Sequence, residues 1–258
     1  MTAGSGCQPL IILASPQSAA AAPVSPIDAA AAACPYARTL GGTMRTLWAE
    51  AIGTFFLFAA VIGSGVLAQQ LAPGAVLLGV LVVTLATVMM LQLLVTMLGP
   101  VSGAQFNPAV SLVLRLRGGG SWGGMLAMIV VQIAAGIAAV WAVHAMFGLP
   151  IVQTATNARD GAGLWLGEFI ATFGLILTVL LTGRHAPQSG ATSVALYIGA
   201  AILFTSSTCF ANPAITIARA MTDTFTGIAP ASAPAFILAE FAGALAAHGL
   251  ERLLYPEG

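Results

Sequence analysis

The stretch SSTCFANPAITIAR, Ser206 to Arg219, interrupts one of the most apolar parts of the chain with an asparagine and a proline. Asn212 suits the N-cap of a helix, because its side chain can accept a hydrogen bond from the first free backbone N–H groups. Pro213 suits the first helical position, where its missing N–H would have had no intrahelical partner. The stretch therefore predicts a helix over about 212–222, too short to cross a bilayer.

The same triplet occurs twice. The two Asn-Pro-Ala boxes are Asn107, Pro108 and Ala109 and, later in the chain, Asn212, Pro213 and Ala214. The first box opens a second short segment, 107–116. AEAIGTFFLF at 49–58 also resembles GEFIATFGLI at 167–176. These matches indicate an internal repeat with halves at about 44–148 and 160–256.

The composition is that of an integral membrane protein. Of the 258 residues, 59% are hydrophobic and only 6% are charged, against about 25% charged residues in soluble domains. The net charge is zero and every basic residue is an arginine, so no basic patch suggests nucleic acid. The cysteines and histidines are scattered, so the sequence predicts no metal site.

A membrane span needs about 20 mostly apolar residues. Six stretches qualify, at about 47–69, 75–98, 122–147, 164–183, 192–209 and 232–254. Each half of the repeat therefore has three spans and one short segment. Because three is odd, the second half enters the membrane from the opposite side, and the two short helices approach the midplane from opposite faces.

The arginines predict the orientation in the cell membrane. With the N-terminus inside, five arginines near span ends are cytoplasmic and two, Arg159 and Arg219, are on the other side. The cytoplasmic five are Arg45, Arg115, Arg117, Arg184 and Arg252. This bias predicts a multi-pass protein with both termini in the cytoplasm.

Residues 1–43 form a separate N-terminal extension rich in Ala, Pro and Ser, which we expect to be disordered. A signal peptide is the alternative, although no basic start precedes a proper apolar core. Since Met44 immediately precedes the first span, a start codon at Met44 is a further hypothesis. The channel domain is then 44–258.

Two half-helices that meet N-terminus to N-terminus suit a pore. Each carries about half a positive elementary charge at its N-terminal end, so their meeting point repels cations. The amides of Asn107 and Asn212 can donate hydrogen bonds to a passing oxygen. This chemistry favours passive movement of small uncharged polar solutes.

The chain resembles the aquaporin and aquaglyceroporin superfamily, the major intrinsic proteins. GPVSGAQFNPAV at 99–110 and FANPAITIAR at 210–219 carry the resemblance, which covers about residues 45–255. It implies an all-α membrane fold of six transmembrane helices and two re-entrant half-helices, a homotetramer, and no cofactor. It also implies that Glu50 and Glu168 hold the backbone of the re-entrant loops. A proton relay through these carboxylates is the alternative.

The resemblance places a selectivity filter at four positions. Counted ungapped from the two asparagines, these are Thr87, Ala200, Cys209 and Ile215. Ile215 stands where water and glycerol channels almost always have arginine, which removes up to five donors and a fixed charge. With small Thr87 and Ala200, we expect a wide, apolar filter for glycerol or neutral metalloid hydroxides. NPAITIARAMTDTFTGIAP resembles a bacterial subgroup associated with arsenic resistance, which adds arsenite and methylated arsenicals as candidates.

Arg219 allows two interpretations. It lies two turns past Asn212, where it can supply a positive charge at the outer vestibule. It can instead pair with Asp223, four residues further along, which is the simpler expectation. For Glu240, in the last span, we expect a buried hydrogen bond to a neighbouring helix.

Other functions are less consistent with the sequence. A channel used mainly for water is one alternative. An ion-coupled secondary transporter is another, and it would have to use one of the three intramembrane glutamates. No nucleophile, base and orienting group converge, so an enzyme is not expected.

Overall fold

The computed structural model describes residues 44–256, which are helical apart from their connections and contain no β-strand. The long helices of the first half are α2 (Met44–Leu71), α3 (Val76–Ser102) and α5 (Trp122–Met146). Those of the second half are α6 (Ala162–His185), α7 (Gly190–Phe204) and α9 (Ala233–Leu254). Two short helices complete the fold, α4 (Pro108–Leu116) and α8 (Pro213–Arg219), and a 3₁₀ turn, η2 (Pro187–Ser189), precedes α7. The predicted extension, residues 1–43, lies outside the described residues.

Five of the six predicted spans are long and apolar enough to cross a membrane, within residues 44–256. The exception is α7, predicted over 192–209 but only 15 residues long. It rises about 22 Å, less than the roughly 30 Å of the hydrocarbon core. The chain leaves the helix at Thr205 and runs without regular structure to Asn212. This is tolerated because Ser207, Phe210 and Ala211 are buried in protein and not exposed to lipid.

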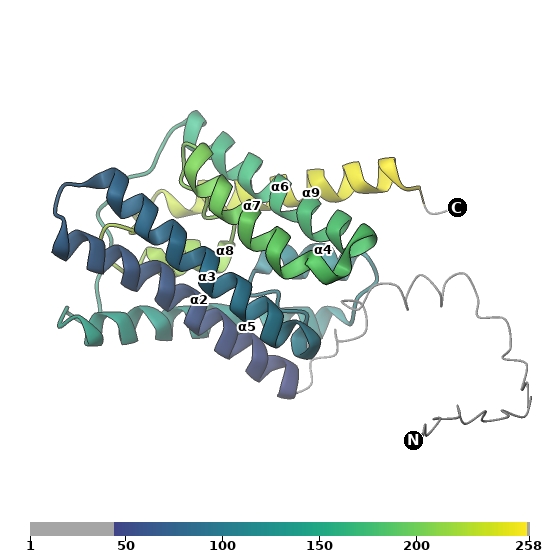
Figure 1. The fold of residues 1–258 in the computed structure, drawn as a ribbon, viewed down its shortest axis with the longest axis horizontal. Helices are drawn as coiled ribbons and strands as arrows, with labels where there is room; N and C mark the ends of the chain where they lie inside the picture. The colour runs from purple at the N-terminus through teal and green to yellow at the C-terminus, as the bar shows by residue number, and fades with distance from the viewer. Residues whose placement is uncertain (1–43, 257–258) are drawn as a thin grey trace, which may run out of the picture.

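The two halves repeat the same packing. In the first half α2 packs on α3 and α5, and in the second α6 packs on α7 and α9. The halves meet where α3 packs on α7, α5 on α8 and α4 on α9. Figure 1 shows α4 and α8 in the middle of the bundle, enclosed by the long helices. The fold is therefore the predicted inverted repeat, with a re-entrant half-helix from each half at its centre.

The asparagines begin the two short helices as their sequence predicts. Asn107 is the N-cap of α4, with its side chain accepting from the N–H of Ala109. Asn212 is the N-cap of α8 and accepts from the N–H groups of Ala214 and Ile215. The helix α8 ends at Arg219, earlier than the predicted 222.

The outer surface of the bundle and its helix contacts fit a lipid environment. Large apolar side chains such as Leu77, Leu85, Met89 and Leu238 are exposed on the long helices. Close contact inside the bundle depends on small residues. At Gly243 in α9, an added Cβ would lie 2.3 Å from the carbonyl oxygen of Phe169 in α6. The two helix backbones can touch here only because the residue is glycine.

Candidate pore

A cavity of about 420 Å³ runs through the bundle, lined by both halves. Its wall on α3 follows one helix face from Val76 to Val95. These residues are 19 positions apart in the sequence, which is about 28 Å of helix and close to the thickness of the hydrocarbon core. The cavity also includes Asn107 and Asn212. It is long enough to connect the two sides of a membrane.

The loops that lead into α4 and α8 share one unusual backbone. Positive φ angles occur at Ala104 (47°) and Phe106 (50°) before the first box, and at Cys209 (50°) and Ala211 (48°) before the second. Gly103 and Thr208 also correspond, with φ of 84° and 62°. Such conformations cost about 1–3 kcal/mol each for residues other than glycine and persist only where surrounding contacts impose them. The two loops therefore need strong support.

Glu50 supports the first loop. Its fully buried carboxylate accepts hydrogen bonds from the backbone N–H groups of Gln105 (2.9 Å) and Phe106 (2.7 Å). The hydroxyl of Ser102 (2.6 Å) and the amide of Gln132 (2.9 Å) donate as well. Two bonds thus hold the strained loop to α2, and the other two fix the carboxylate to the end of α3 and to α5.

Glu168 does the same in the second loop. Its two oxygens accept from the backbone N–H groups of Phe210 (2.9 Å) and Ala211 (2.7 Å). Glu240 in α9 accepts a hydrogen bond from the hydroxyl of Thr216 in α8 (2.6 Å). This is the buried hydrogen bond to a neighbouring helix that the sequence predicts for Glu240. None of the three carboxylates lines the cavity.

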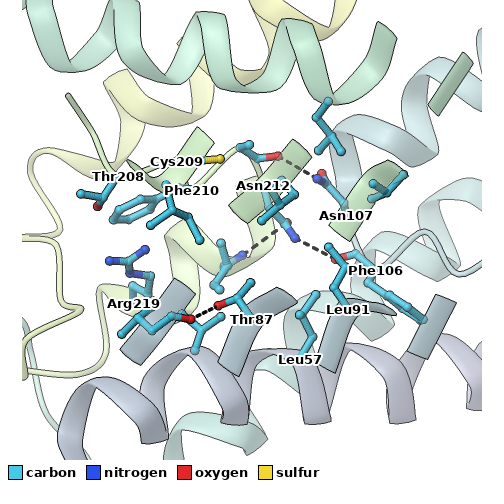
Figure 2. A pocket seen from close by; sticks show the side chains of 18 of the residues that line it. Leu57, Thr87, Leu91, Phe106, Asn107, Thr208, Cys209, Phe210, Asn212 and Arg219 are labelled. Carbon is cyan, nitrogen blue, oxygen red and sulfur yellow. Dashed lines mark hydrogen bonds between the residues drawn. The ribbon is translucent and has the colours of Figure 1, made fainter. Parts of the chain in front are cut away.

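The two asparagines also bind each other's loop. Asn107 Nδ2 donates to the carbonyl of Ala211 (2.7 Å), and Asn212 Nδ2 donates to the carbonyl of Phe106 (2.8 Å). Each amide nitrogen has a second N–H, and both asparagines line the cavity (Figure 2). One donor of each amide therefore fixes the loops, and the other makes no hydrogen bond within residues 44–256.

Three of the four predicted filter residues line the cavity, namely Thr87, Cys209 and Ile215. Ala200 does not line it, because its side chain is exposed on the outside of the bundle. That prediction is wrong. The cavity face of α7 consists of Val194, Ile198 and Ile202. Ala200 lies two residues from each isoleucine, and because two residues turn a helix by about 200°, its side chain points away from the cavity.

Ile198 takes the place predicted for Ala200. Its neighbour Gly199 packs on Val88 of α3, one residue from Thr87, so Ile198 and Thr87 lie at the same depth. The i, i+4 spacing of Val194, Ile198 and Ile202 was the sequence signal that counting from Asn212 missed. Ile198 and Thr87 therefore face the cavity at one level, and Ile215 and Cys209 line the same cavity.

Arg219 lines one end of the cavity and does not pair with Asp223. The Arg219 Nε donates to the carbonyl of Thr226, and its guanidinium carbon lies 3.4 Å from the centre of the Phe210 ring. Asp223 instead accepts from the N–H and hydroxyl of Thr156, both at 2.9 Å. The expected intrahelical ion pair is wrong because Arg219 points inward from the last residue of α8 (Figure 2). Asp223 lies in the connection beyond α8.

Further polar residues that the sequence did not place there also line the cavity, and Arg159 and Gln105 are two of them. Arg159, in the connection before α6, has its guanidinium carbon 5.3 Å from the centre of the same Phe210 ring. Gln105 is buried at the first loop, and neither its Oε1 nor its Nε2 has a partner among residues 44–256. In that part of the chain, no group of three His, Cys, Asp or Glu side chains could hold a metal ion.

A bundle with two re-entrant half-helices around a lined cavity defines a membrane channel, and comparison with known proteins identifies its family. The profile of the major intrinsic protein family matches residues 38–211. The chain is 45% identical over 213 residues to aquaglyceroporin AqpS of Rhizobium meliloti (strain 1021), which covers 82% of this chain and 91% of that protein. The chain therefore belongs to the major intrinsic protein family, the aquaporin and aquaglyceroporin superfamily, and is a multi-pass membrane channel.

More distant relatives are also aquaporins or glycerol facilitators by name. Aquaporin NIP1-4 of Oryza sativa subsp. japonica is 31% identical over 221 residues, covering 81% of this chain and 78% of that protein. A glycerol uptake facilitator protein of Streptococcus pneumoniae (strain ATCC BAA-255 / R6) is 28% identical over 189 residues, covering 66% and 80%. The X-ray structure of the aquaglyceroporin from Plasmodium falciparum matches with a TM-score of 0.62 at 18% identity, covering 82% of this chain and 97% of that one. This structural match supports the fold alone.

Proposed function

We propose that the chain is a passive channel for small neutral polar solutes larger than water, glycerol and neutral metalloid hydroxides such as arsenite or methylated arsenicals among them. The observation that carries the proposal is the position directly after the second box. Ile215 lines the cavity there beside Thr87, Ile198 and Cys209. At this position the wall has no guanidinium to bind water or to narrow the passage. The guanidinium groups of Arg159 and Arg219 lie at one end of the cavity.

The cavity chemistry favours solutes with both apolar and polar surface. Most of its wall is aliphatic, and the polar side chains are those of the two loops, the asparagines, Thr87 and one end. Glycerol and a metalloid trihydroxide present hydroxyl groups to such donors while tolerating an apolar wall on the other side. The facing N-termini of α4 and α8 oppose cations at the same time.

Similarity to relatives points the same way. A relative at 45% identity is named an aquaglyceroporin, and a more distant one is named a glycerol uptake facilitator. A channel used mainly for water remains the second candidate. An ion-coupled transporter is disfavoured because Glu50, Glu168 and Glu240 lie outside the cavity wall and bind protein groups.

Stopped-flow light scattering of proteoliposomes tests the proposal with water, glycerol, urea and arsenite. We expect glycerol and arsenite fluxes that follow the gradient and do not change with ionophores. Ile215→Arg should lower both by about tenfold or more by placing a guanidinium in the passage, whereas Ile215→Val, the matched control, should not. Unchanged glycerol and arsenite flux in Ile215→Arg would show that Ile215 is not at the constriction.

We also propose a homotetramer with both termini in the cytoplasm. In support, the start of α2 and the end of α9 lie at the same end of the bundle in Figure 1. Glu251 at this end binds Arg117 and Arg184, so basic residues gather there as cytoplasmic segments require. Light scattering of the purified protein in detergent measures the assembly, and labelling of cysteines introduced beside Arg252 measures the orientation.

A further inference from the structure

We infer that Arg159 and Arg219 form a binding site for a small organic oxyanion at one end of the cavity. We call this end the arginine mouth and define it by Asn157, Arg159, Thr208, Arg219, Phe225 and Thr226, all of which line the cavity. The arginine rule that orients the chain places this end on the outside. Binding here is independent of the proposed channel function.

The two guanidinium groups share one aromatic ring. The guanidinium carbon of Arg219 lies 3.4 Å and that of Arg159 lies 5.3 Å from the centre of the Phe210 ring. They are therefore no farther apart than these two distances together. Phe210 is itself fixed, because it packs edge-on against Phe236 at 5.1 Å and its N–H binds Glu168. The two cations are held near each other by a rigid support.

Backbone carbonyls fix both side chains through one nitrogen each. Arg219 Nε donates to the carbonyl of Thr226, and Arg159 Nε donates to the carbonyl of Gly227 (3.0 Å). The Nη groups of both arginines make no hydrogen bond to any residue in 44–256, and Figure 2 shows the Arg219 guanidinium beside Phe210 and Thr208. Donors that are preorganised and unused are what an oxyanion requires.

No carboxylate of the described residues forms an ion pair with either arginine. The buried Glu168 attracts both arginines, and Glu240 attracts Arg219, without direct contact. Both ion pairs of that part of the chain belong to Glu251 at the opposite end. Glu168, behind the loop, uses both oxygens on backbone N–H groups. Asp160 and Asp223 are exposed, and Asp223 binds Thr156. Two like charges close together in a poorly hydrated site repel each other, and a bound anion relieves that repulsion.

The remaining walls indicate the kind of anion. Thr226 is buried, and its hydroxyl, which has no partner in residues 44–256, can donate to a third oxygen. Phe225, Val83 and Ile202 are apolar and line the same cavity. The mouth therefore fits a singly charged oxyanion with a short apolar group, whose oxygens face the arginines and whose apolar end faces the aliphatic wall.

Methanesulfonate is a suitable probe because it stays anionic at every pH used, and dimethyl sulfone is a neutral molecule of similar size and shape. We would measure binding to the purified full chain in detergent by isothermal titration calorimetry, at constant ionic strength set with chloride. We expect saturable binding of methanesulfonate and none of dimethyl sulfone. Arg219→Gln and Arg159→Gln should each weaken binding about tenfold or more, since each removes a charge-assisted donor.

Two further variants make the outcome decisive. Thr226→Val is similar in shape and should weaken binding less than the loss of either arginine. Arg252→Gln removes one positive charge from an exposed site in the last turn of α9 and should change nothing. Equal binding of the sulfone, or equal weakening by Arg252→Gln, would overturn the inference, as would absence of binding to the wild type. Because binding is measured without flux, failure here leaves the proposed channel function standing, and failure of glycerol flux leaves this site standing.

Discussion

Asn107 and Asn212 each donate a hydrogen bond to the carbonyl of the residue that precedes the other, at 2.7 Å to Ala211 and 2.8 Å to Phe106. The same side chains cap α4 and α8 through their oxygens. One residue type thus performs two tasks in each half. The amide oxygen begins the helix, and the amide nitrogen joins it to the other half.

These two tasks can be separated by mutation. Asn107→Ser keeps a good N-cap but is too short and lacks the amide donor, so the carbonyl of Ala211 loses its partner. We expect a loss of about 1–3 kcal/mol in the free energy of unfolding. Asn107→Ala also removes the cap and should cost about 0.5–2 kcal/mol more. Denaturation of the purified protein measures both, and equal stability of the Ser and Ala variants would contradict the separate role of the cap.

The loop-supporting glutamates allow a second prediction. In Glu50→Gln, one carboxylate oxygen becomes an amide nitrogen, which donates and no longer accepts. Ser102 or Gln132 can accept from this nitrogen, but the backbone N–H of Gln105 or of Phe106 can only donate and loses its acceptor. In Glu168→Gln, the backbone N–H of Phe210 or of Ala211 loses its acceptor for the same reason. Each variant therefore leaves one buried donor unpaired and should lose about 1.5–3 kcal/mol of stability.

The flux of these variants tests the alternative role of the carboxylates. We expect Glu50→Gln and Glu168→Gln to keep the glycerol flux per folded channel, because neither carboxylate lines the cavity. The control is Asp160→Asn, an exposed acid that should change neither stability nor flux. Lost flux with unchanged stability would support a proton relay instead.

Local signals explain how much of this architecture could be predicted. The Asn-Pro-Ala boxes begin α4 and α8 because N-cap and first-turn preferences act within three residues. Glu50 and Glu168 are identifiable because an intramembrane carboxylate needs a partner, and the repeat places both at equivalent positions. Such features do not depend on where distant segments pack.

The errors concern directions that tertiary contacts decide. Counting back from Asn212 predicts Ala200, but the residues from Thr205 to Asn212 are not helical and have no fixed rotation per residue. Helical spacing pairs Asp223 with Arg219, but α8 ends at Arg219 and Thr156 from a distant segment binds the carboxylate. The sequence does not predict the arginine mouth, because Arg159 and Arg219 lie far apart in the chain and meet only through the Phe210 ring.

The Asp223 contact predicts a pH dependence at the arginine-mouth end. Hydrogen bonds from the N–H and the hydroxyl of Thr156 lower the pKa of Asp223 below its ordinary value of 3.8. Because the pKa in the folded state is lowered, the stabilisation is fully present above the unfolded value and is lost as the pH falls through the folded one. The melting temperature of wild type minus that of Asp223→Asn should be constant from about pH 5 to 8 and shrink below about pH 4. A difference that instead grew on acidification would contradict this assignment.

The finding that Ile198, and not Ala200, faces the cavity can be tested by one substitution on each face of α7. Ile198→Ala removes three carbons from the cavity wall beside Thr87, so solutes larger than glycerol, such as the four-carbon polyol erythritol, should pass faster relative to water. Because Ile198 borders an existing cavity, its loss should destabilise the protein near the lower end of the roughly 2–5 kcal/mol known for such truncations. Ala200→Ile adds the same atoms on the exposed face and should leave erythritol and glycerol fluxes unchanged. Slower polyol flux in Ala200→Ile, with no faster flux in Ile198→Ala, would show that Ala200 and not Ile198 belongs to the selectivity filter.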